Sequence, residues 1–344
     1  MPRNKRTAKL CFLQTLPGLE QVAWLEVRRR LPSAQFKADA YARNRYGVTL
    51  FTMMAELEAL DELRLGEALY IGALWIPKLS RGHRDLRRVE NELIQRGDLG
   101  RAVNLYSRRQ RRQIGSYHVV AEKFGQHQYR LRDWSRAVRQ AVSRLYPKWE
   151  GTQGPADVEI WAAVLGSQAL IGLRLPQPDE EIPASPYPAT LAAGLVELTE
   201  PAADDLFLDP LAVDGGMVLA ERWQAGEATA LWAGRGLIPT EEGALDHADS
   251  GHIWTAGRLS IAAGTVDKMA SIIPSGVEEN VVLTYLHEAA RLLHPQGKLA
   301  LFTYDYDRFL DLVRDEPRLQ VSSGHSVLAA GAWGRIYVIE QAAE

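Results

Sequence analysis

The chain has 344 residues, of which 46% are hydrophobic and 24% are charged. The length predicts two or three domains, and the composition is that of a globular protein with no apolar run long enough to cross a bilayer. The net charge of −3 hides an asymmetry, because residues 78–148 hold 18 Lys and Arg against 6 Asp and Glu, whereas residues 176–280 hold 4 against 18. This distribution predicts one module that meets a polyanion and another that does not.

The single cysteine, Cys11, excludes an internal disulfide framework and lies in an apolar run that indicates a core position. Basic residues at the start of the chain are followed by no apolar signal-peptide region. We therefore expect a cytoplasmic protein without a membrane partner.

Residues 10–75 alternate between strand-like and helix-like segments. Apolar runs at 10–14, 46–51 and 70–75 predict strands, and the segments at 20–30 and 55–65 predict helices. This order fits a small α+β sandwich of the split-βαβ type. Nothing in it indicates catalysis.

Residues 78–148 carry the positive charge. Four of the five positions 108–112 are arginine, and a helix predicted over 132–146 has apolar residues on one face and arginines on another. A charged run alone is typical of a solvated face, but an arginine stripe beside a buried face favours phosphate, which arginine binds in a two-pronged manner. The predicted RNA contacts are Arg108, Arg109, Arg111, Arg112, Lys123, Arg132, Arg136 and Arg139.

The stretch from Ser116 to Trp134 precedes a predicted hairpin over 157–173 that turns near Gly166, and together they resemble a THUMP domain, an RNA-binding module. In that family a ferredoxin-like domain comes first. The resemblance implies a ferredoxin-like domain at 1–75 and a THUMP domain at 76–175, which grip structured RNA, typically the acceptor end of tRNA. The proline-rich, acidic segment 176–188 is predicted to be a semi-rigid linker.

Residues 189–344 alternate between apolar strand-like runs and helical segments and end in strand-like runs at 327–330 and 335–340. This predicts a mainly parallel sheet covered by helices, with an antiparallel pair at the end. The predicted fold class is therefore α/β, with ferredoxin-like and THUMP α+β modules before a Rossmann-like methyltransferase domain. The chain resembles THUMP-bearing enzymes that methylate guanine N2 in tRNA with S-adenosylmethionine.

The cofactor motif of these enzymes corresponds to the segment from Asp209 to Glu221. Asp209 and Pro210 match, but Val213 stands at the first glycine, where a branched side chain hinders left-handed backbone and close ligand approach. The predicted strand at 228–232 is followed by Arg235 and by no carboxylate that would accept the ribose hydroxyls. The predicted cofactor-binding residues are Asp209, Pro210, Gly215, Gly216 and Asp267.

The catalytic motif of the family places an Asn oxygen and a prolyl carbonyl against the exocyclic amine and an aromatic ring on the flipped base. Here Ile272 stands at the amide and Ser275 at the ring. Isoleucine cannot accept the proton of the attacking amine, so no intact catalytic residue is predicted. The degenerate loop consists of Ile272, Ile273, Pro274, Ser275 and Gly276.

Two functions follow from these observations. The first is an RNA-binding protein, with tRNA as the expected partner, whose catalytically impaired methyltransferase domain needs no cofactor and serves as a scaffold or binds a protein. The alternative is an active S-adenosylmethionine-dependent guanine-N2 methyltransferase of tRNA or rRNA, with Asp209, Asp214 or Asp267 in an atypical site.

Other candidate groups are weaker. His287 and His294 lie seven residues apart without an acidic or cysteine partner at ligand spacing, so surface or cap roles are favoured and no metal is predicted. The sequence Gly324-His325-Ser326 lacks a nucleophile elbow and a further triad partner.

Overall fold

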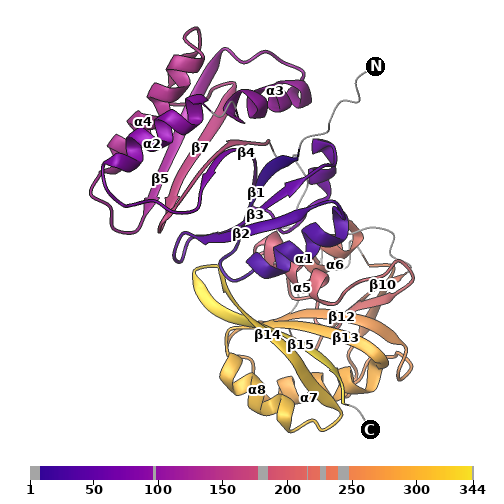
Figure 1. Cartoon of the computed structure of the whole chain (residues 1–344). Helices are drawn as coiled ribbons and strands as arrows, with labels where there is room; N and C mark the ends of the chain where they lie inside the picture. The colour runs from indigo at the N-terminus through magenta and orange to yellow at the C-terminus, as the bar shows by residue number, and fades with distance from the viewer. Residues whose placement is uncertain are drawn as a thin grey trace. The chain divides into compact units, whose positions relative to one another are not determined.

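The structure is a computed structural model that describes residues 8–95, 98–176, 185–214, 216–224, 230–238 and 248–342. The chain divides into two compact units, one of residues 1–15 and 23–178 and the other of residues 16–22 and 179–344 (Figure 1). Each unit is built on its own sheet. Within the described ranges, no helix is long and apolar enough to cross a membrane.

The first unit contains an eight-stranded sheet. Its strands are β1 (Lys9–Thr15), β2 (Gln35–Tyr41), β3 (Gly47–Met53), β4 (Ala68–Ile76), β5 (Ser116–Phe124), β6 (Glu150–Thr152), β7 (Val158–Leu165) and β8 (Gln168–Arg174), in the order β2-β3-β1-β4-β8-β7-β5-β6. β4 pairs antiparallel with β8. The strands of residues 9–76 and those of residues 116–174 therefore belong to one continuous sheet. Trp161 stacks on Tyr70 with ring centroids 4.6 Å apart, which joins the two halves of the core. Cys11 is fully buried, as predicted, and burial raises its pKa to about 12.

The helices of the first part of the chain are α1 (Glu20–Arg30), α2 (Arg84–Gln95), α3 (Asp98–Gln110) and α4 (Leu131–Leu145). The helix predicted over 55–65 is wrong, because only a 3-10 helix, η1 (Leu57–Glu62), forms there. Its buried residues Leu57 and Leu60 are three positions apart, the spacing that lies on one side of a 3-10 helix. The predicted helix over 132–146 is confirmed as α4.

The second unit contains a seven-stranded sheet. Its strands are β9 (Leu206–Asp209), β10 (Ala230–Arg235), β11 (Ser250–Ile253), β12 (Val266–Ile273), β13 (Leu293–Thr303), β14 (Leu319–Ala329) and β15 (Ala332–Gln341), in the order β11-β10-β9-β12-β13-β15-β14. The first five are parallel, and β15 is antiparallel to both β13 and β14. This confirms the predicted α/β class with a mainly parallel sheet and an antiparallel pair at the end.

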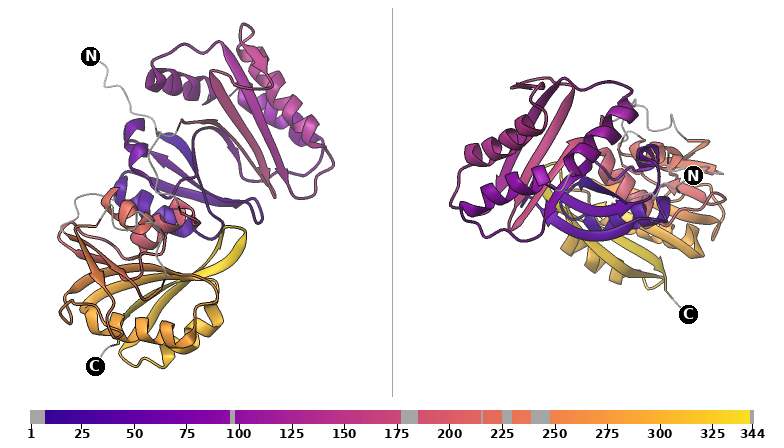
Figure 2. Two further views of the ribbon diagram at one scale, coloured as in Figure 1. Left: turned by 180° about the vertical axis from the view of Figure 1, so that it is seen from behind. Right: turned by 45° about the horizontal axis from the view of Figure 1, so that its top comes forward.

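The four helices of the second unit lie on both faces of its sheet. They are α5 (Ala189–Leu198), α6 (Met217–Gln224), α7 (Glu279–Leu292) and α8 (Tyr306–Arg314). Helices α5 and α6 cover one face, and α7 and α8 cover the other (Figure 1 and Figure 2). The strand order reverses between β9 and β12, and in open α/β sheets ligands bind outside the carboxyl ends of the strands at such a switch point. Asp209, the last residue of β9, stands at this point.

Candidate functional site

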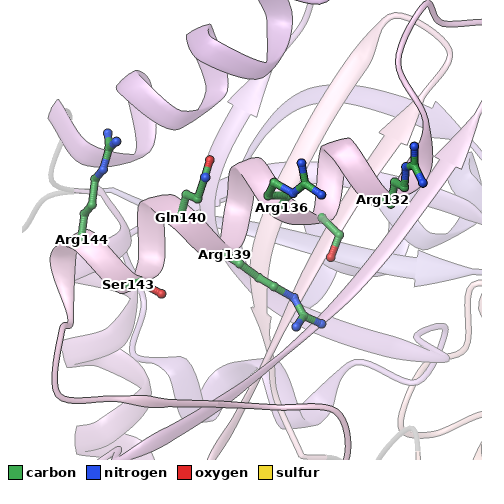
Figure 3. A pocket seen from close by; sticks show the side chains of 7 residues that line it. Arg132, Arg136, Arg139, Gln140, Ser143 and Arg144 are labelled. Atoms are coloured by element: carbon green, nitrogen blue, oxygen red, sulfur yellow. The ribbon is translucent and has the colours of Figure 1, made fainter.

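One face of α4 lines a surface hollow of about 580 Å³ in the first unit. Figure 3 shows the Arg132 and Arg136 side chains pointing toward one edge of the helix and the Arg139 side chain toward the other edge, and all three line the hollow. The lining contains no carboxylate and consists of Arg132, Ser135, Arg136, Arg139, Gln140, Ser143 and Arg144. The hollow, called the α4 hollow below, therefore presents guanidinium groups together with small hydrogen-bonding side chains.

The opposite face of α4 explains why these arginines point outward. Trp134 and Val138 are fully buried, and the indole N–H of Trp134 donates to the carbonyl oxygen of Ala162 on β7 at 2.9 Å. The helix begins with a cap in which the N–H of Arg130 donates to the Asp133 carboxylate at 3.0 Å. The apolar face and the cap fix the rotation of the helix, which leaves its arginines on the surface.

The arginines of the α4 hollow differ in their partners. Arg144 forms an ion pair with Glu90 of α2 at 2.8 Å, whereas in the described part of the chain Arg136 and Arg139 form none. The Nε of Arg139 is buried and has no hydrogen-bond partner among the described residues.

A second hollow of about 680 Å³ lies in the first unit between the turn from β2 to β3 and the end of β5. We call it the turn hollow, and it is lined by Ala42, Arg43, Asn44, Arg45, Lys123, Phe124 and Gly125. The guanidinium carbon of Arg45 lies 5.7 Å from the centroid of the Phe124 ring. Behind this surface, the Glu122 carboxylate accepts hydrogen bonds from the Tyr46 hydroxyl and, at 2.9 Å, from the Trp161 indole.

Of the residues that line the turn hollow, sequence reasoning singled out only Lys123. The sequence Arg43-Asn44-Arg45 carries a signal, because two basic residues flank an amide just before a predicted strand. Its proximity to Lys123, some 80 residues away, depends on the order of strands in the sheet and has no local signature.

The four arginines at 108–112 differ in their contacts. Arg109 donates to the carbonyl oxygen of Leu57 at 2.6 Å and pairs with Asp61, and Arg112 donates to the carbonyl oxygen of Asp157. Arg108 and Arg111 are exposed, at the end of α3 and in the turn that follows. Arg109 and Arg112 hold parts of the first unit together. Contact of any of the four arginines with RNA stays a prediction.

In the second unit, two buried carboxylates organise the loop after β9. Oδ1 of Asp209 accepts from the N–H groups of Leu211 and Ala212 at 3.1 Å each and from the Ser271 hydroxyl at 2.6 Å. Asp214 accepts from the N–H groups of Gly216 at 3.0 Å and of Val218 at 2.8 Å. Both carboxylates therefore already accept hydrogen bonds from backbone N–H groups of the loop and the start of α6. The predicted residue Gly215 lies outside the described residues.

Burial raises the pKa of Asp209 to about 7, and the negative charge of Asp214 adds to this shift. Burial also raises the pKa of Asp214, against the hydrogen bonds from the start of α6. The loop therefore holds two acidic groups that resist ionisation, chiefly because they are buried and, for Asp209, also because Asp214 is close by.

The other predicted cofactor residue, Asp267, lies at the opposite end of the sheet. It is the second residue of β12, and its Oδ2 accepts from the N–H of Leu206 at the start of β9 at 2.9 Å. The structure brings Asp209 and Pro210 together at the carboxyl edge but places Asp267 away from them.

The loop that matches the catalytic motif follows β12 at the carboxyl edge. Ile272 and Ile273 are buried, whereas Ser275 and Gly276 are exposed, and the N–H of Gly276 donates to Asp305 at 3.2 Å. Ser271, beside the loop, is bound to Asp209. The motif thus reaches the expected edge of the sheet with an apolar side chain at the position of its polar acceptor.

Of the histidines singled out in the sequence, His287 lies on α7, His294 at the start of β13 and His325 in β14. Nε2 of His287 is 3.4 Å from Oε2 of Glu316. Across the ranges that the structure describes, no group of three or more His, Cys, Asp and Glu side chains is placed to hold a metal ion.

No family model matches the chain, and no curated protein matches it in sequence. Among solved structures, TrmN from Thermus thermophilus is similar, with a TM-score of 0.71 and 21% identity, over 97% of this chain and 100% of that chain. A possible methylase from Clostridium difficile 630 has a TM-score of 0.64 and 12% identity, over 98% and 99%. A predicted N6-adenine-specific DNA methylase from Listeria monocytogenes str. 4b F2365 has a TM-score of 0.57 and 13% identity, over 96% of each chain. These likenesses establish the fold, an α/β chain whose second unit is Rossmann-like.

Proposed function

We propose that this protein binds RNA, with tRNA as its partner, through its first unit, and that its Rossmann-like unit does not transfer methyl groups. In this proposal residues 1–75 form a ferredoxin-like domain, residues 76–175 a THUMP domain and residues 189–344 the methyltransferase-like domain, and the protein is cytoplasmic. The α4 hollow is the observation that carries the proposal, because it gathers arginines without a carboxylate. The DNA methylase among the similar structures names a nucleic-acid substrate for this fold.

The geometry of α4 suits a phosphate backbone. With a rise of about 1.5 Å per residue, Arg132 and Arg136 are about 6 Å apart along the helix axis, and Arg139 is about 4.5 Å further on. Each guanidinium binds phosphate oxygens in a two-pronged manner and releases condensed counterions.

The turn hollow, a separate surface of the first unit, adds groups that bind more than phosphate. Phe124 and the guanidinium of Arg45 are flat groups of the kind on which unpaired bases stack, and the Asn44 amide both donates and accepts hydrogen bonds. Arg43 and Lys123 supply the charge. The first unit therefore offers both backbone contacts and base contacts, which favours RNA with unpaired nucleotides over a plain polyanion.

In this proposal the Rossmann-like unit lacks the polar side chains that guanine-N2 methyl transfer requires. Ile272 is buried at the position where the attacking amine needs a polar acceptor. Asp209 and Asp214, the alternatives near the same edge, already accept hydrogen bonds from their own loop. These observations support the binding protein over the active guanine-N2 methyltransferase.

Two assays on the full chain test the proposal. We expect fluorescently labelled tRNA to bind with micromolar or tighter affinity, and labelled S-adenosylmethionine to transfer no methyl group to bulk tRNA above background. An active tRNA methyltransferase serves as positive control for the second assay. Absence of RNA binding, or incorporation of label that depends on this protein, would contradict the proposal.

A further inference from the structure

In the second unit the carboxyl edge around the switch point is crossed by the chain's own side chains. Trp254 directly follows β11, and its N–H donates to the carbonyl oxygen of Arg235 at the end of β10 at 3.0 Å. Its indole N–H donates to the carbonyl oxygen of Pro210, after β9, at 2.7 Å. Because β10 lies between β11 and β9, the indole reaches across the end of β10. Only 8% of Trp254 is exposed.

The backbone next to this indole is also tightly packed. A Cβ atom on Gly234 of β10 would lie 2.2 Å from the carbonyl oxygen of Pro210 and 3.0 Å from its Cα. The absence of a side chain at Gly234 therefore lets the loop after β9 lie directly against β10. Leu211, Ala212 and Val213, which continue that loop, are all buried.

The segment after Trp254 is held in place by α7. The Glu288 carboxylate, which is buried, accepts from the N–H of Leu259 at 2.7 Å. Arg291 is paired with Glu288 and donates to the carbonyl oxygens of Leu259 at 3.2 Å and Ile261 at 2.9 Å. A turn between Thr255 and Arg258 connects this anchored part to Trp254. Trp254 is thus part of the packed structure and does not sit on a loose lid.

The residues at this edge do not fit S-adenosylmethionine. The described residues after β10 are Gly236, Leu237 and Ile238, which offer no carboxylate to the ribose hydroxyls. The carbonyl oxygen of Pro210 is already paired with an indole, and the space above Gly234 is filled by backbone.

We propose that Trp254 occupies the position at which this fold binds the nucleoside of a ligand, so that the chain's own indole fills the nucleoside site of the second unit. This inference rests on the proposed loss of methyl transfer and names the residue responsible for the loss of cofactor binding. It explains how the unit keeps a Rossmann-like sheet without an open nucleoside crevice.

The test replaces Trp254 with alanine in the full chain. The control is Trp223→Ala, because Trp223 on α6 is 57% exposed. Trp254→Ala is expected to lower the melting temperature by roughly 6 °C or more, since a large buried side chain is removed. Millimolar indole is expected to recover part of this loss, because a closed apolar cavity binds a molecule of the removed shape. Neither wild type nor the control should respond to indole.

Calorimetry with S-adenosylhomocysteine completes the test. We expect no binding of S-adenosylhomocysteine to wild type. If Trp254→Ala unfolds the unit, the milder variant Trp254→Phe gives the same comparison of melting temperatures with a smaller loss. Wild-type binding that either variant abolishes would show that Trp254 contacts a bound nucleoside, which would overturn the inference. A melting temperature of Trp254→Ala that equals wild type, or that indole leaves unchanged, would overturn the Trp254 assignment alone. Methyl transfer to tRNA by wild type would instead overturn the proposed function.

Discussion

Replacing Arg132, Arg136 and Arg139 with glutamine is expected to weaken tRNA binding roughly a hundredfold at about 0.1 M salt, because each lost phosphate contact removes counterion release. The same variant should lower the slope of log affinity against log salt by about 2 to 3, at about 0.7 to 0.9 for each contact. Fluorescence anisotropy at several salt concentrations measures both quantities. The three side chains line the α4 hollow, and the buried face of the helix is left unchanged.

The matched control replaces Arg308 and Arg314 with glutamine. Both lie on α8 of the second unit and are half exposed or more, at 50% and 67%. We expect this variant to bind tRNA like wild type. Because the control removes two charges and the α4 variant removes three, an equal loss for each removed charge would mean that total charge, and not the α4 hollow, determines binding. A salt slope that the triple variant leaves unchanged would mean that the α4 arginines are a solvated face.

The second large effect is a change in how stability depends on pH. In the native state burial raises the pKa of Asp209 from its ordinary value of 3.8 to about 7. The folded protein therefore holds a proton between about pH 4 and pH 7 that the unfolded chain releases. The free energy of unfolding then falls as pH rises through this window, by up to about 1.4 kcal/mol for each pH unit.

Asp209→Asn is expected to remove this part of the pH dependence. The amide oxygen keeps the role of acceptor for Leu211, Ala212 and Ser271 without a charge. At pH 8 the variant should therefore be more stable than wild type, and near pH 4 the difference should vanish or reverse. Urea denaturation of the full chain between pH 4 and pH 8 measures this difference in the free energy of unfolding. Hydrogen exchange of amides in the second unit shows whether the difference arises there.

The control for this experiment is Asp311→Asn. The Asp311 side chain is 74% exposed and forms a surface ion pair with Arg314, so its loss should change stability by less than about 0.5 kcal/mol at any pH. A wild-type curve parallel to that of Asp209→Asn over the whole range would contradict the account of the buried carboxylates.

Apolar segments are the parts of the fold that the sequence predicts well. The strand predicted over 70–75 lies within β4, and the hairpin predicted over 157–173 forms as β7 and β8, with Gly166 at φ 62 in the turn. These strands are buried on both faces, so their composition alone identifies them. The helix α4 is found because Trp134 and Val138 repeat at helical spacing.

Polar elements escape prediction. β2 has the sequence QFKADAY and is mostly exposed at the edge of its sheet, and β11 has only four residues, also at an edge. α2 buries only Asp85, Val89 and Leu93 among many charged residues. Edge strands and surface helices need little apolar sequence because their neighbours provide the buried surface.

The candidate site was predictable only where its residues lie on one element. Arg132, Arg136 and Arg139 share one helix, so their common surface can be read from spacing. Trp254 and Pro210 come together only because β11, β10 and β9 are neighbours, and nothing local in the sequence connects them. The sequence likewise leaves open that Arg109 serves packing, since its partner Asp61 lies 48 residues earlier.

The central claim is that RNA binds to the first unit at α4, and cross-link mapping tests it most directly. Bound tRNA is cross-linked to the full chain by ultraviolet light, and the peptides that carry nucleotides are identified by mass spectrometry. We predict cross-links within α4 (Leu131–Leu145) and around the turn hollow at Phe124. Cross-links confined to residues 185–342, with none in the first unit, would contradict the account.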